Sequence, residues 1–424
     1  MILVIKMNKT YLCIDLKTFY ASVECAERGL DPFKTDLIVA DPKRSRGAIT
    51  LAITPHMKEQ GIKNRCRVYE IPKNIKPIVA IPRMKKYMEY SARIYKIYLK
   101  YVSREDIHVY SVDEAFLDVT SYLKLYKKDG IGIAKMIMKD IYKTTKITAT
   151  AGIGTNLFLA KVALDILSKH SKTNIGYLDE ELFKEKLWNH TPLTDFWQIG
   201  KGIEERLLKY NIHTMKEITE INSNVLYKEF GIHAKYLIDH ANGVEPCTIK
   251  EIKEYKPKSN SLTSTQILYE DYNSKDAKIV LTEMIDNLLG KMILDGYQTK
   301  NISVYIGYSK DRIPSLKYSI SFDKATNSYR KLGKSILEKY DYKINNDTPI
   351  RRIGISFHQL EKKGLHQLDI FHEEEEEQEE LKTEKIINEL KQKFGKNSIL
   401  RAISHTKKAT AIKRNQLIGG HNAE

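Results

Sequence analysis

Cysteines and long apolar runs are scarce in this sequence, and both shortages exclude whole classes of protein. The four cysteines among 424 residues show no CxxC spacing, so neither a structural zinc site nor a disulfide framework is predicted. No apolar run approaches the roughly 18 residues of a membrane span, and the opening MILVI is interrupted at Lys6, too early for a signal-peptide core. We therefore expect a cytoplasmic protein with no membrane partner.

Acidic residues are outnumbered by basic ones. Lys and Arg total 70 against 54 Asp and Glu, which gives a formal net charge of +16. Residues 361–424 contain equal numbers of both signs, so the whole excess lies in the preceding part of the chain. A body this basic attracts polyanions, of which nucleic acid and an anionic membrane surface are the usual candidates, and charge alone does not choose between them.

The first part of the chain predicts a sheet domain. A chain of 424 residues corresponds to roughly three domains at about 150 residues each. Short apolar runs predict strands, and longer amphipathic segments between them predict helices, an alternation typical of an α/β or α+β domain. The expected strands are 11–16, 36–40, 107–112, 115–120 and 146–153, and the expected helices are 19–27, 84–101 and 131–145.

The rest of the chain predicts a helical module, a tether, a second sheet unit and a charged tail. Short helical segments joined by turn signals, without strand-like alternation, indicate the module at 180–245. The run EEEEEQEE at 373–380 begins a tail whose composition favours a solvated linker or exposed helix over a core. The tether is expected at 247–260, strands at 302–308, 315–322 and 351–357, and helices at 275–293, 328–340 and 381–394.

Three carboxylates follow predicted strands. Asp15 ends the first strand, and Asp113 and Glu114 lie between two others, in SVDEAFLDV. Magnesium binds oxygen ligands, and one or two carboxylates together with substrate phosphates form a site for it. Two such ions about 4 Å apart can activate an attacking hydroxyl and stabilise a leaving pyrophosphate. The alternative is that these acids are ordinary solvated turn residues.

Four segments together resemble the Y-family translesion DNA polymerases, in the order of that family. They are IDLKTFYASVE at 14–24, YSVDEAFLDVT at 110–120, ITATAGIGTNLFLAKVALD at 147–165 and DFWQIGKGIEERLLKYNI at 195–212. The resemblance implies a multidomain α+β fold with the right-hand architecture of a polymerase. Its parts would be a palm at 1–25 and 81–178, small fingers at 26–80, an all-helical thumb at 179–246, a linker at 247–258, an α+β little finger at 259–360 and a tail at 361–424.

The same resemblance assigns the active site. It makes Asp15, Asp113 and Glu114 the catalytic carboxylates and ligands of two Mg²⁺ ions, with the Leu16 carbonyl as an additional metal ligand. Tyr20, preceded by Phe19, corresponds to the steric gate, a ring under the incoming sugar that excludes a 2′ hydroxyl. The implied substrates are primed DNA template and deoxynucleoside triphosphates. Without the flanking match, Phe19 and Tyr20 would be read as helix residues with one face in the core.

Two segments depart from the family pattern for holding the triphosphate. In the fingers, Pro55 and Lys58 occupy the places where many members have a Tyr and an Arg. Lysine keeps the charge but lacks the planar guanidinium fork, and it favours the UmuC-like branch; otherwise Lys58 is an exposed helical lysine. In the palm, Ser168 takes the place of a lysine, and Lys169 comes one residue late. Either a local shift allows Lys169 to bind the nucleotide, or that contact is missing.

Two further segments predict partners. Gly200, Lys201 and Gly202 resemble a helix-hairpin-helix turn, whose backbone N–H groups bind a DNA phosphate without reading sequence; the alternative is an ordinary glycine-containing turn. QLDIF at 367–371 resembles the peptide that docks bacterial polymerases on the sliding clamp, and a short apolar turn would look the same. The residues that this peptide would use for clamp binding are Gln367, Leu368, Ile370 and Phe371.

The function implied is low-fidelity, template-directed DNA synthesis across damaged template, by a polymerase core that we expect to be monomeric. A nucleotidyl cyclase would use similar paired acids and two metals, but it would need neither the thumb hairpin nor the clamp peptide. A non-catalytic, DNA-binding accessory protein that retains the fold is conceivable because of Pro55 and Ser168. The intact carboxylates Asp15, Asp113 and Glu114 argue against it.

Overall fold

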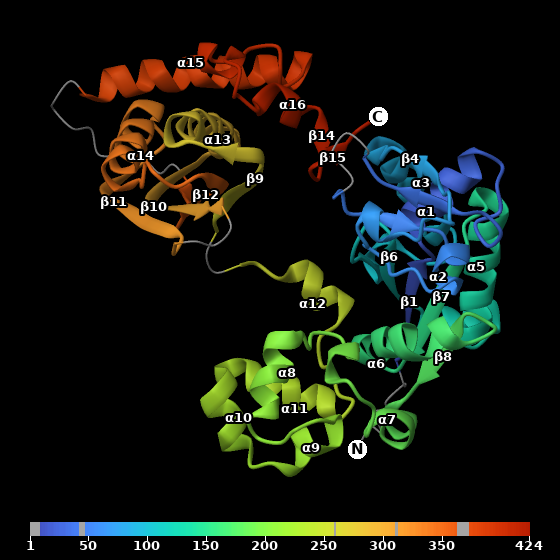
Figure 1. Ribbon diagram of the computed structural model, residues 1–424. Coiled ribbons are helices and arrows are strands. Elements are labelled where there is room, and N and C mark those ends of the chain that lie inside the picture. The colour runs from blue at the N-terminus through green and yellow to red at the C-terminus, as the bar shows by residue number, and fades with distance from the viewer. Residues whose placement is uncertain (1–8, 42–46, 258–259, 310–312, 363–372) are drawn as a thin grey trace. The chain divides into compact units, whose positions relative to one another are not determined.

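The computed structural model describes residues 9–41, 47–257, 260–309, 313–362 and 373–424. The described chain divides into two units: one comprises the residues up to Tyr255 together with His421–Glu424, and the other comprises Lys256–Gly420. Both contain sheets and helices (Figure 1), so the prediction of a multidomain α+β fold is confirmed. Among the described helices, none is both long and apolar enough to cross a membrane.

The first unit is built on a five-stranded sheet in the order β5-β6-β1-β7-β8. The central strand β1 pairs antiparallel with both β6 and β7, which places Asp15 opposite Glu114 on one side and Thr150 on the other. All but one residue of β1 is buried, as its nearly continuous apolar sequence predicts. The strands are β1 Tyr11–Leu16, β5 Ile107–Val109, β6 Glu114–Asp118, β7 Ala149–Gly154 and β8 Ile175–Leu178.

Helices cover both faces of this sheet. On one face α5 packs against β1 and β7 and also against α3, and on the other face α6 packs against the same two strands. A Cβ at Gly152 would lie 2.1 Å from the Ala160 carbonyl oxygen, and one at Gly154 would lie 2.3 Å from the Ala160 nitrogen. These glycines therefore allow α6 to approach the strand backbone closely. The helices are α1 Phe19–Glu27, α3 Met84–Tyr98, α4 Tyr122–Tyr126, α5 Gly130–Thr145 and α6 Leu157–Val162.

A small sheet follows α1 in the chain, within the segment predicted as fingers. It has the order β3-β2-β4, and its core includes Ile38, Ile53 and Met57. Only the first of its strands was expected from the sequence, whereas the other two were not predicted. The elements are β2 Leu37–Val39, β3 Ala52–Ile53, α2 Pro55–Glu59 and β4 Ile78–Ala80.

The predicted helical module is present, and one more helix follows it. Where a linker was expected at 247–258, the structure contains α12, which begins with a capping box between Thr248 and Glu251. Its Ile249 is buried beside Phe116, because the apolar face of this short helix docks on the palm sheet instead of remaining solvated. The helices are α7 Glu180–Leu187, α8 Lys201–Leu208, α9 Met215–Glu220, α10 Ser223–Phe230, α11 Ala234–Ala241 and α12 Ile249–Glu254.

The second unit contains a four-stranded antiparallel sheet in the order β11-β10-β12-β9. Helices α13 and α14 pack with the buried faces of these strands into one core, and the opposite face of the sheet is open. Along β11, for example, Tyr318 and Ile320 are buried whereas Lys317, Ser319 and Ser321 are exposed. The elements are β9 Leu262–Tyr272, α13 Ser274–Leu294, β10 Tyr297–Tyr308, β11 Leu316–Thr326, α14 Tyr329–Lys343, β12 Ile350–His358 and β13 Glu361–Lys362.

The tail differs from the expected solvated linker or exposed helix. Helix α15, Glu373–Phe394, packs on α13 (Figure 1), and α16, Ala411–Asn415, follows it before the short strands β14 Leu417–Ile418 and β15 His421–Asn422. Glu283 of α13 is buried and accepts hydrogen bonds from the backbone N–H groups of Thr410 and Ala411, at 2.8 and 3.0 Å. Composition missed this docking because charged side chains, rather than an apolar stripe, make many of the contacts.

Candidate active site

The predicted carboxylates lie at one end of the palm sheet, where β1 and β6 meet. Asp15 and Glu114 are opposite residues of the two strands, and Asp113 precedes β6 in the tight turn from β5. The Leu16 N–H donates to the Asp113 carbonyl at 3.0 Å, and the Ser111 hydroxyl donates to the Asp113 carboxylate at 2.6 Å. The strand pairing therefore brings together residues that are about 100 positions apart in the sequence.

The electrostatics of this end of the sheet favour a cation beside Asp15. Burial raises the pKa of Asp15 to about 7, against the pull of the Lys169 charge. The negative charges of Asp113 and Glu114 add to this rise in pKa. A carboxylate whose pKa is raised in this way releases its proton when a divalent cation binds beside it.

The donor set suits magnesium more than a metal that needs many protein ligands. Among the described residues, no group of three or more His, Cys, Asp or Glu side chains is arranged to hold an ion. Mg²⁺ needs only one or two carboxylates and completes its shell with water and substrate phosphates. Asp15 and Asp113 meet that requirement. The Leu16 carbonyl points to the same side of β1 as its N–H, which donates to Asp113.

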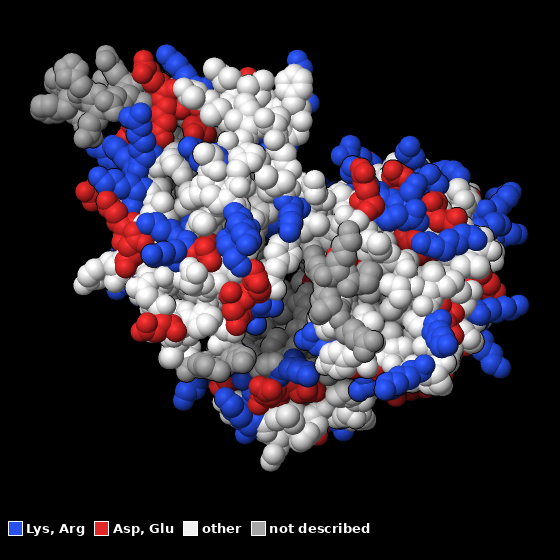
Figure 2. Space-filling model, turned by 45° about the horizontal axis from the view of Figure 1, so that its top comes forward, with Lys and Arg blue, Asp and Glu red and all other residues white. Residues whose placement is uncertain are grey.

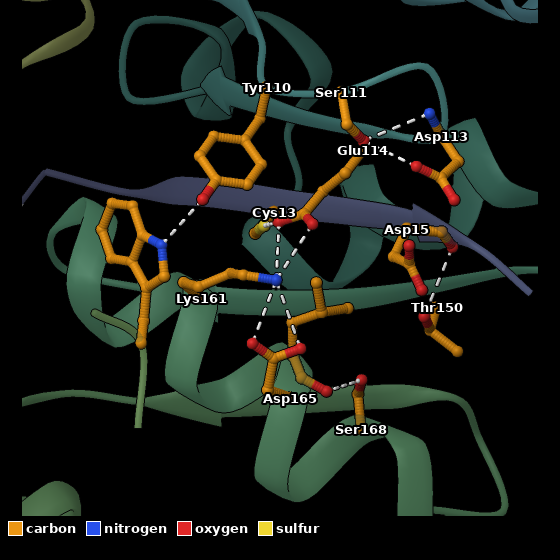
Figure 3. A network of polar contacts seen from close by, with 12 residues as sticks. Cys13, Asp15, Tyr110, Ser111, Asp113, Glu114, Thr150, Lys161, Asp165 and Ser168 are labelled. Atoms are coloured by element: carbon orange, nitrogen blue, oxygen red, sulfur yellow. Dashed lines mark hydrogen bonds and ion pairs between the residues drawn. The ribbon is translucent and has the colours of Figure 1, made fainter. Parts of the chain in front are cut away.

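The third carboxylate, Glu114, is engaged by a lysine that the sequence analysis did not single out. Lys161 of α6 contacts Glu114 at 2.8 Å and Asp165 at 3.0 Å (Figure 3). The Cys13 thiol also donates to Glu114, at 3.1 Å. The i, i+4 spacing of Lys161 and Asp165 in AKVALD was the available sequence signal for this ion pair.

The segment after α6 explains why the second lysine comes one residue late. Residues Ala163–Leu167 form a π-helical turn, which contains about one residue more than an α-helical turn. Ser168 is consequently buried, and its hydroxyl donates to the Leu164 carbonyl at 2.7 Å. Lys169 is exposed, and like Lys161 it contacts the Asp165 carboxylate, at 2.7 Å. The π-helical turn is the kind of local shift that would let Lys169 reach the nucleotide, and the nucleotide contact itself stays a prediction.

Tyr20 and Phe19 have different environments. Phe19 is buried in the core, so a contact between Phe19 and a nucleotide would have to use its backbone. Tyr20 is half-buried, and its ring stacks on Tyr87 with 4.6 Å between centroids. The Tyr87 hydroxyl donates to the fully buried Glu24 at 2.9 Å, and Arg83 forms an ion pair with the same carboxylate. The sequence analysis did not single out these contacts of Glu24 behind the Tyr20 ring, although Glu24 ends the first signature segment.

Lys58 lies on α2, in the segment predicted as fingers, and its charge interacts with that of Asp15. Its side chain is exposed, and partial desolvation of the ammonium group lowers its pKa, as do the nearby cations Lys169 and Lys17, while Asp15 acts in the opposite direction. Lys17 donates to the Asn174 side chain at 2.7 Å. Lys58 and Lys169 therefore both interact with the charge of Asp15, and Lys17 interacts with that of Lys58.

The predicted DNA-binding turn opens α8. Gly200 caps the helix and Lys201 begins it, and Lys201 is exposed. A Cβ added at Gly200 or Gly202 would meet no heavy atom within 4 Å. The protein's own packing therefore does not require these glycines, which leaves room for the close approach of another molecule's backbone. The predicted clamp-binding residues Gln367, Leu368, Ile370 and Phe371 lie outside the described residues.

Comparison with known proteins identifies the family. A family model described as the impB/mucB/samB family matches residues 14–165, and the model of its C-terminal domain matches residues 259–370. The putative UV-damage repair protein UvrX of Bacillus subtilis (strain 168) is 31% identical over 420 residues, which cover 98% of each chain. The chain belongs to the Y family of DNA polymerases.

Other Y-family relatives match over similar lengths. DNA polymerase IV 2 of Bacillus subtilis (strain 168) is 28% identical over 422 residues, covering 98% of this chain and 99% of its own. Among solved structures, a Y-family DNA polymerase chimera, Dbh-Dpo4(243-245)-Dbh, superposes with a TM-score of 0.63 at 22% identity. It covers 84% of this chain and 100% of its own, which establishes the Y-family polymerase fold.

Proposed function

We propose that this protein is a template-directed DNA polymerase that extends a primer across damaged template, with Asp15 and Asp113 as the ligands that hold two Mg²⁺ ions. The observation that carries the proposal is the meeting of Asp15, Asp113 and Glu114 at one end of the β1–β6 pair. Family members similar over almost the whole chain are named DNA polymerase IV or UV-damage repair proteins. Y-family polymerases use divalent metal ions; their identity and number here are part of the proposal.

In the proposed reaction, the primer 3′ hydroxyl attacks the α-phosphate and pyrophosphate leaves. The bound ions would lower the pKa of the attacking hydroxyl and offset the charge that develops on the phosphates. Asp15 and Asp113, with the Leu16 carbonyl, would hold them in position. Glu114, on the strand next to Asp15, would supply the third carboxylate, with its negative charge shared between Lys161 and the ion.

The triphosphate would bind on the lysine side of the site. Lys58 and Lys169 both lie near Asp15, from the fingers and the palm respectively. Lysine offers a point charge without the paired donors of arginine, so the triphosphate is held by charge more than by shape. Tyr20 stacks on the Tyr87 ring close to Asp113 and would lie under the sugar as the steric gate.

The grip on DNA is proposed to be independent of sequence. Basic side chains cover more of the face shown in Figure 2 than acidic ones do. The turn at Gly200–Gly202 suits a phosphate, and the open face of the second sheet carries hydroxyl groups with Lys317 beside the Tyr305 ring. Contacts of these kinds position a duplex without specifying bases, as copying of any template requires.

The rival functions fit less well. A nucleotidyl cyclase would not need the second unit, whereas the family's C-terminal model matches residues 259–370 there. An accessory protein without catalysis would not need Asp15, Asp113 and Glu114 to converge. The UmuC-like branch, a cytoplasmic location and a monomeric core remain predictions from the sequence.

Primer extension by the full-length protein tests the proposal. With Mg²⁺ and deoxynucleotides, the wild type should extend a primer on undamaged template and past an abasic site. Asp113→Ala should abolish extension, whereas Asp118→Ala, at the far end of the same strand β6, should retain it. If a folded wild-type protein binds primed DNA without extending it, the accessory reading is favoured instead.

Clamp docking is tested separately in the same assay. Adding the sliding clamp should lengthen the products of the wild type. The double replacement of Gln367 and Phe371 by alanine should remove this gain and leave extension without the clamp unchanged. An equal gain for both proteins would rule out QLDIF as the docking peptide.

A further inference from the structure

Four charged side chains form a continuous row from the nucleotide side of the palm to the catalytic carboxylate. In order they are Glu114, Lys161, Asp165 and Lys169, with alternating signs (Figure 3 shows the first three). The nearest contacts are 2.8 Å from Glu114 to Lys161, 3.0 Å from Lys161 to Asp165 and 2.7 Å from Asp165 to Lys169. The buried end is Glu114 and Lys161, and the exposed end is Lys169.

We propose that Asp165 is a positioning residue that couples capture of the triphosphate by Lys169 to release of Glu114 from Lys161. The inference rests on the proposed function, because it assigns Lys169 to the triphosphate and Glu114 to a metal ion. It adds a role for two residues, Asp165 and Lys161, that touch neither substrate. Nucleotide binding and completion of the metal site would then be linked steps.

The physical basis is competition for shared cations. Asp165 is shared between Lys161 and Lys169, and Lys161 is shared between Glu114 and Asp165. When Lys169 turns to the triphosphate, Asp165 loses one cation and attracts Lys161 more strongly. The ion pair between Lys161 and Glu114 then weakens, and the Glu114 oxygens become available to the metal ion. Because Lys161 is largely buried, these exchanges are screened less than surface ion pairs.

The geometry of the π-helical turn supports a dedicated role for Asp165. This residue lies within Ala163–Leu167, and π-helical turns occur often at functional sites. Both contacts of Asp165, with Lys161 and with Lys169, join residues four positions apart. Between the two lysines Ser168 is buried, which leaves Lys169 as the exposed, outer partner of Asp165.

The first test measures binding of Mn²⁺ alone, by electron paramagnetic resonance, to the full-length protein in the absence of nucleotide. Lys169→Ala imitates a captured lysine, so it should tighten Mn²⁺ binding when Asp165 is present. In the Asp165→Asn background the same replacement should have an effect smaller by about threefold or more, since contacting residues in one network couple by at least this much. Equal effects in both backgrounds would reflect simple repulsion between Lys169 and the ion, and would overturn the proposal.

The second test separates kcat from KM for the incoming deoxynucleotide. Asp165→Asn frees Lys169 but leaves Lys161 with Glu114 as its only carboxylate among these four. We expect KM to fall about twofold and kcat to fall about tenfold. A tenfold loss lies within the usual range for coupling between two linked sites. Asp165→Glu should recover part of kcat. A rise in KM together with the fall in kcat would indicate a merely structural role and contradict the proposal.

A matched control is available in the same domain. Asp140 accepts a contact from Lys100 at 3.0 Å, and its side chain is about as exposed as that of Asp165. Asp140→Asn should change neither the Mn²⁺ cycle nor the kinetic split. Circular dichroism and thermal unfolding establish that each variant is folded. If the wild type does not extend primers, the proposed function fails, whereas the Mn²⁺ cycle still reports on the coupling by itself.

Discussion

The two large sheets of this protein are covered differently, and the difference determines where each carries its function. Helices pack on both faces of the β5-β6-β1-β7-β8 sheet, so polar chemistry is confined to the ends of its strands. The β11-β10-β12-β9 sheet has helices on one face, and its open face holds a hollow of about 460 Å³. That hollow is lined by residues such as Thr265, Ser303, Tyr305, Lys317 and Ser356.

The comparison teaches that a site at strand ends depends on few residues, whereas an open face spreads its contacts over many. Asp15 and Asp113 are the two proposed metal ligands, and each should be costly to lose. Hydroxyl groups along β9, β10, β11 and β12 should be individually replaceable, since each would add one weak contact to a surface that we propose follows the DNA backbone. Each of the following predictions tests one side of this contrast.

The largest effect is expected at Asp15 on the covered sheet. Its pKa in the folded protein is raised to about 7, so between pH 4 and 7 the unfolded chain loses this proton first. Folding stability without metal should therefore fall as pH rises through that window, by about 2 to 4 kcal/mol in total. Asp15→Asn should remove this part of the fall. Urea unfolding at pH 5 and pH 8 in EDTA measures it, and identical pH dependence in both proteins would contradict the assignment.

The buried attachment of the tail should give the next largest effect. Glu283→Ala removes the acceptor of the Thr410 and Ala411 N–H groups, which leaves buried donors unpaired. We expect the second unit to lose about 2 to 3 kcal/mol of unfolding free energy. Glu338→Ala, an exposed glutamate on α14, should cost less than about 0.5 kcal/mol. Calorimetric unfolding of both variants measures these losses of unfolding free energy. Equal losses in the two variants would show that the tail is not docked as described.

Nucleotide selection at the covered sheet should respond strongly to Tyr20. Tyr20→Ala removes the ring that is stacked on Tyr87, so a 2′ hydroxyl no longer collides with it. The preference for deoxynucleotides over ribonucleotides, measured as the ratio of kcat/KM values, should fall about thirtyfold. Tyr342→Ala, an exposed tyrosine of the second unit, serves as the control. An unchanged ratio in Tyr20→Ala would remove the steric gate from this position.

The smallest effect is expected on the open face. Lys317→Ala removes one cation from the hollow of the second sheet, and it should weaken binding of primed DNA about twofold to threefold. The slope of log Kd against log salt concentration should fall by about 0.9, the value for one phosphate contact. Lys334→Ala on helix α14 should leave the slope unchanged. A loss of more than about tenfold would mean that this face depends on single residues after all.

How far the sequence predicted the structure follows the same contrast. The strand, turn and helix around Asp15 were predictable, because the apolar run 11–16 and the amphipathic helix Phe19–Glu27 are set by local pattern. The convergence of Asp15 with Asp113 came from the family resemblance, since no local signal specifies which strands pair. The Lys161–Asp165 pair had a spacing signal, but nothing in the spacing indicated Glu114 as the third member.

Other features depended on contacts that composition does not reveal. The π-helical turn at Ala163–Leu167, directly before Ser168 and Lys169, has no simple sequence signature. The docking of the tail on α13 uses scattered ion pairs such as Asp286 with Arg401 and Lys391, and charged residues with that spacing are equally typical of a solvated helix. The α12 helix was missed because six residues are too few for a clear periodic pattern.

The central claim is that a few residues at the strand ends perform the chemistry while DNA is held elsewhere. It is tested most directly by single-turnover incorporation, with the wild type and Asp113→Asn each saturated with primed DNA, alongside Kd for that DNA and the control Asp118→Asn. We predict incorporation slower by about 1,000-fold or more in Asp113→Asn, because a metal ligand is lost, with Kd unchanged within about twofold. Incorporation within tenfold of the wild type, or a parallel loss of DNA binding, would contradict the account.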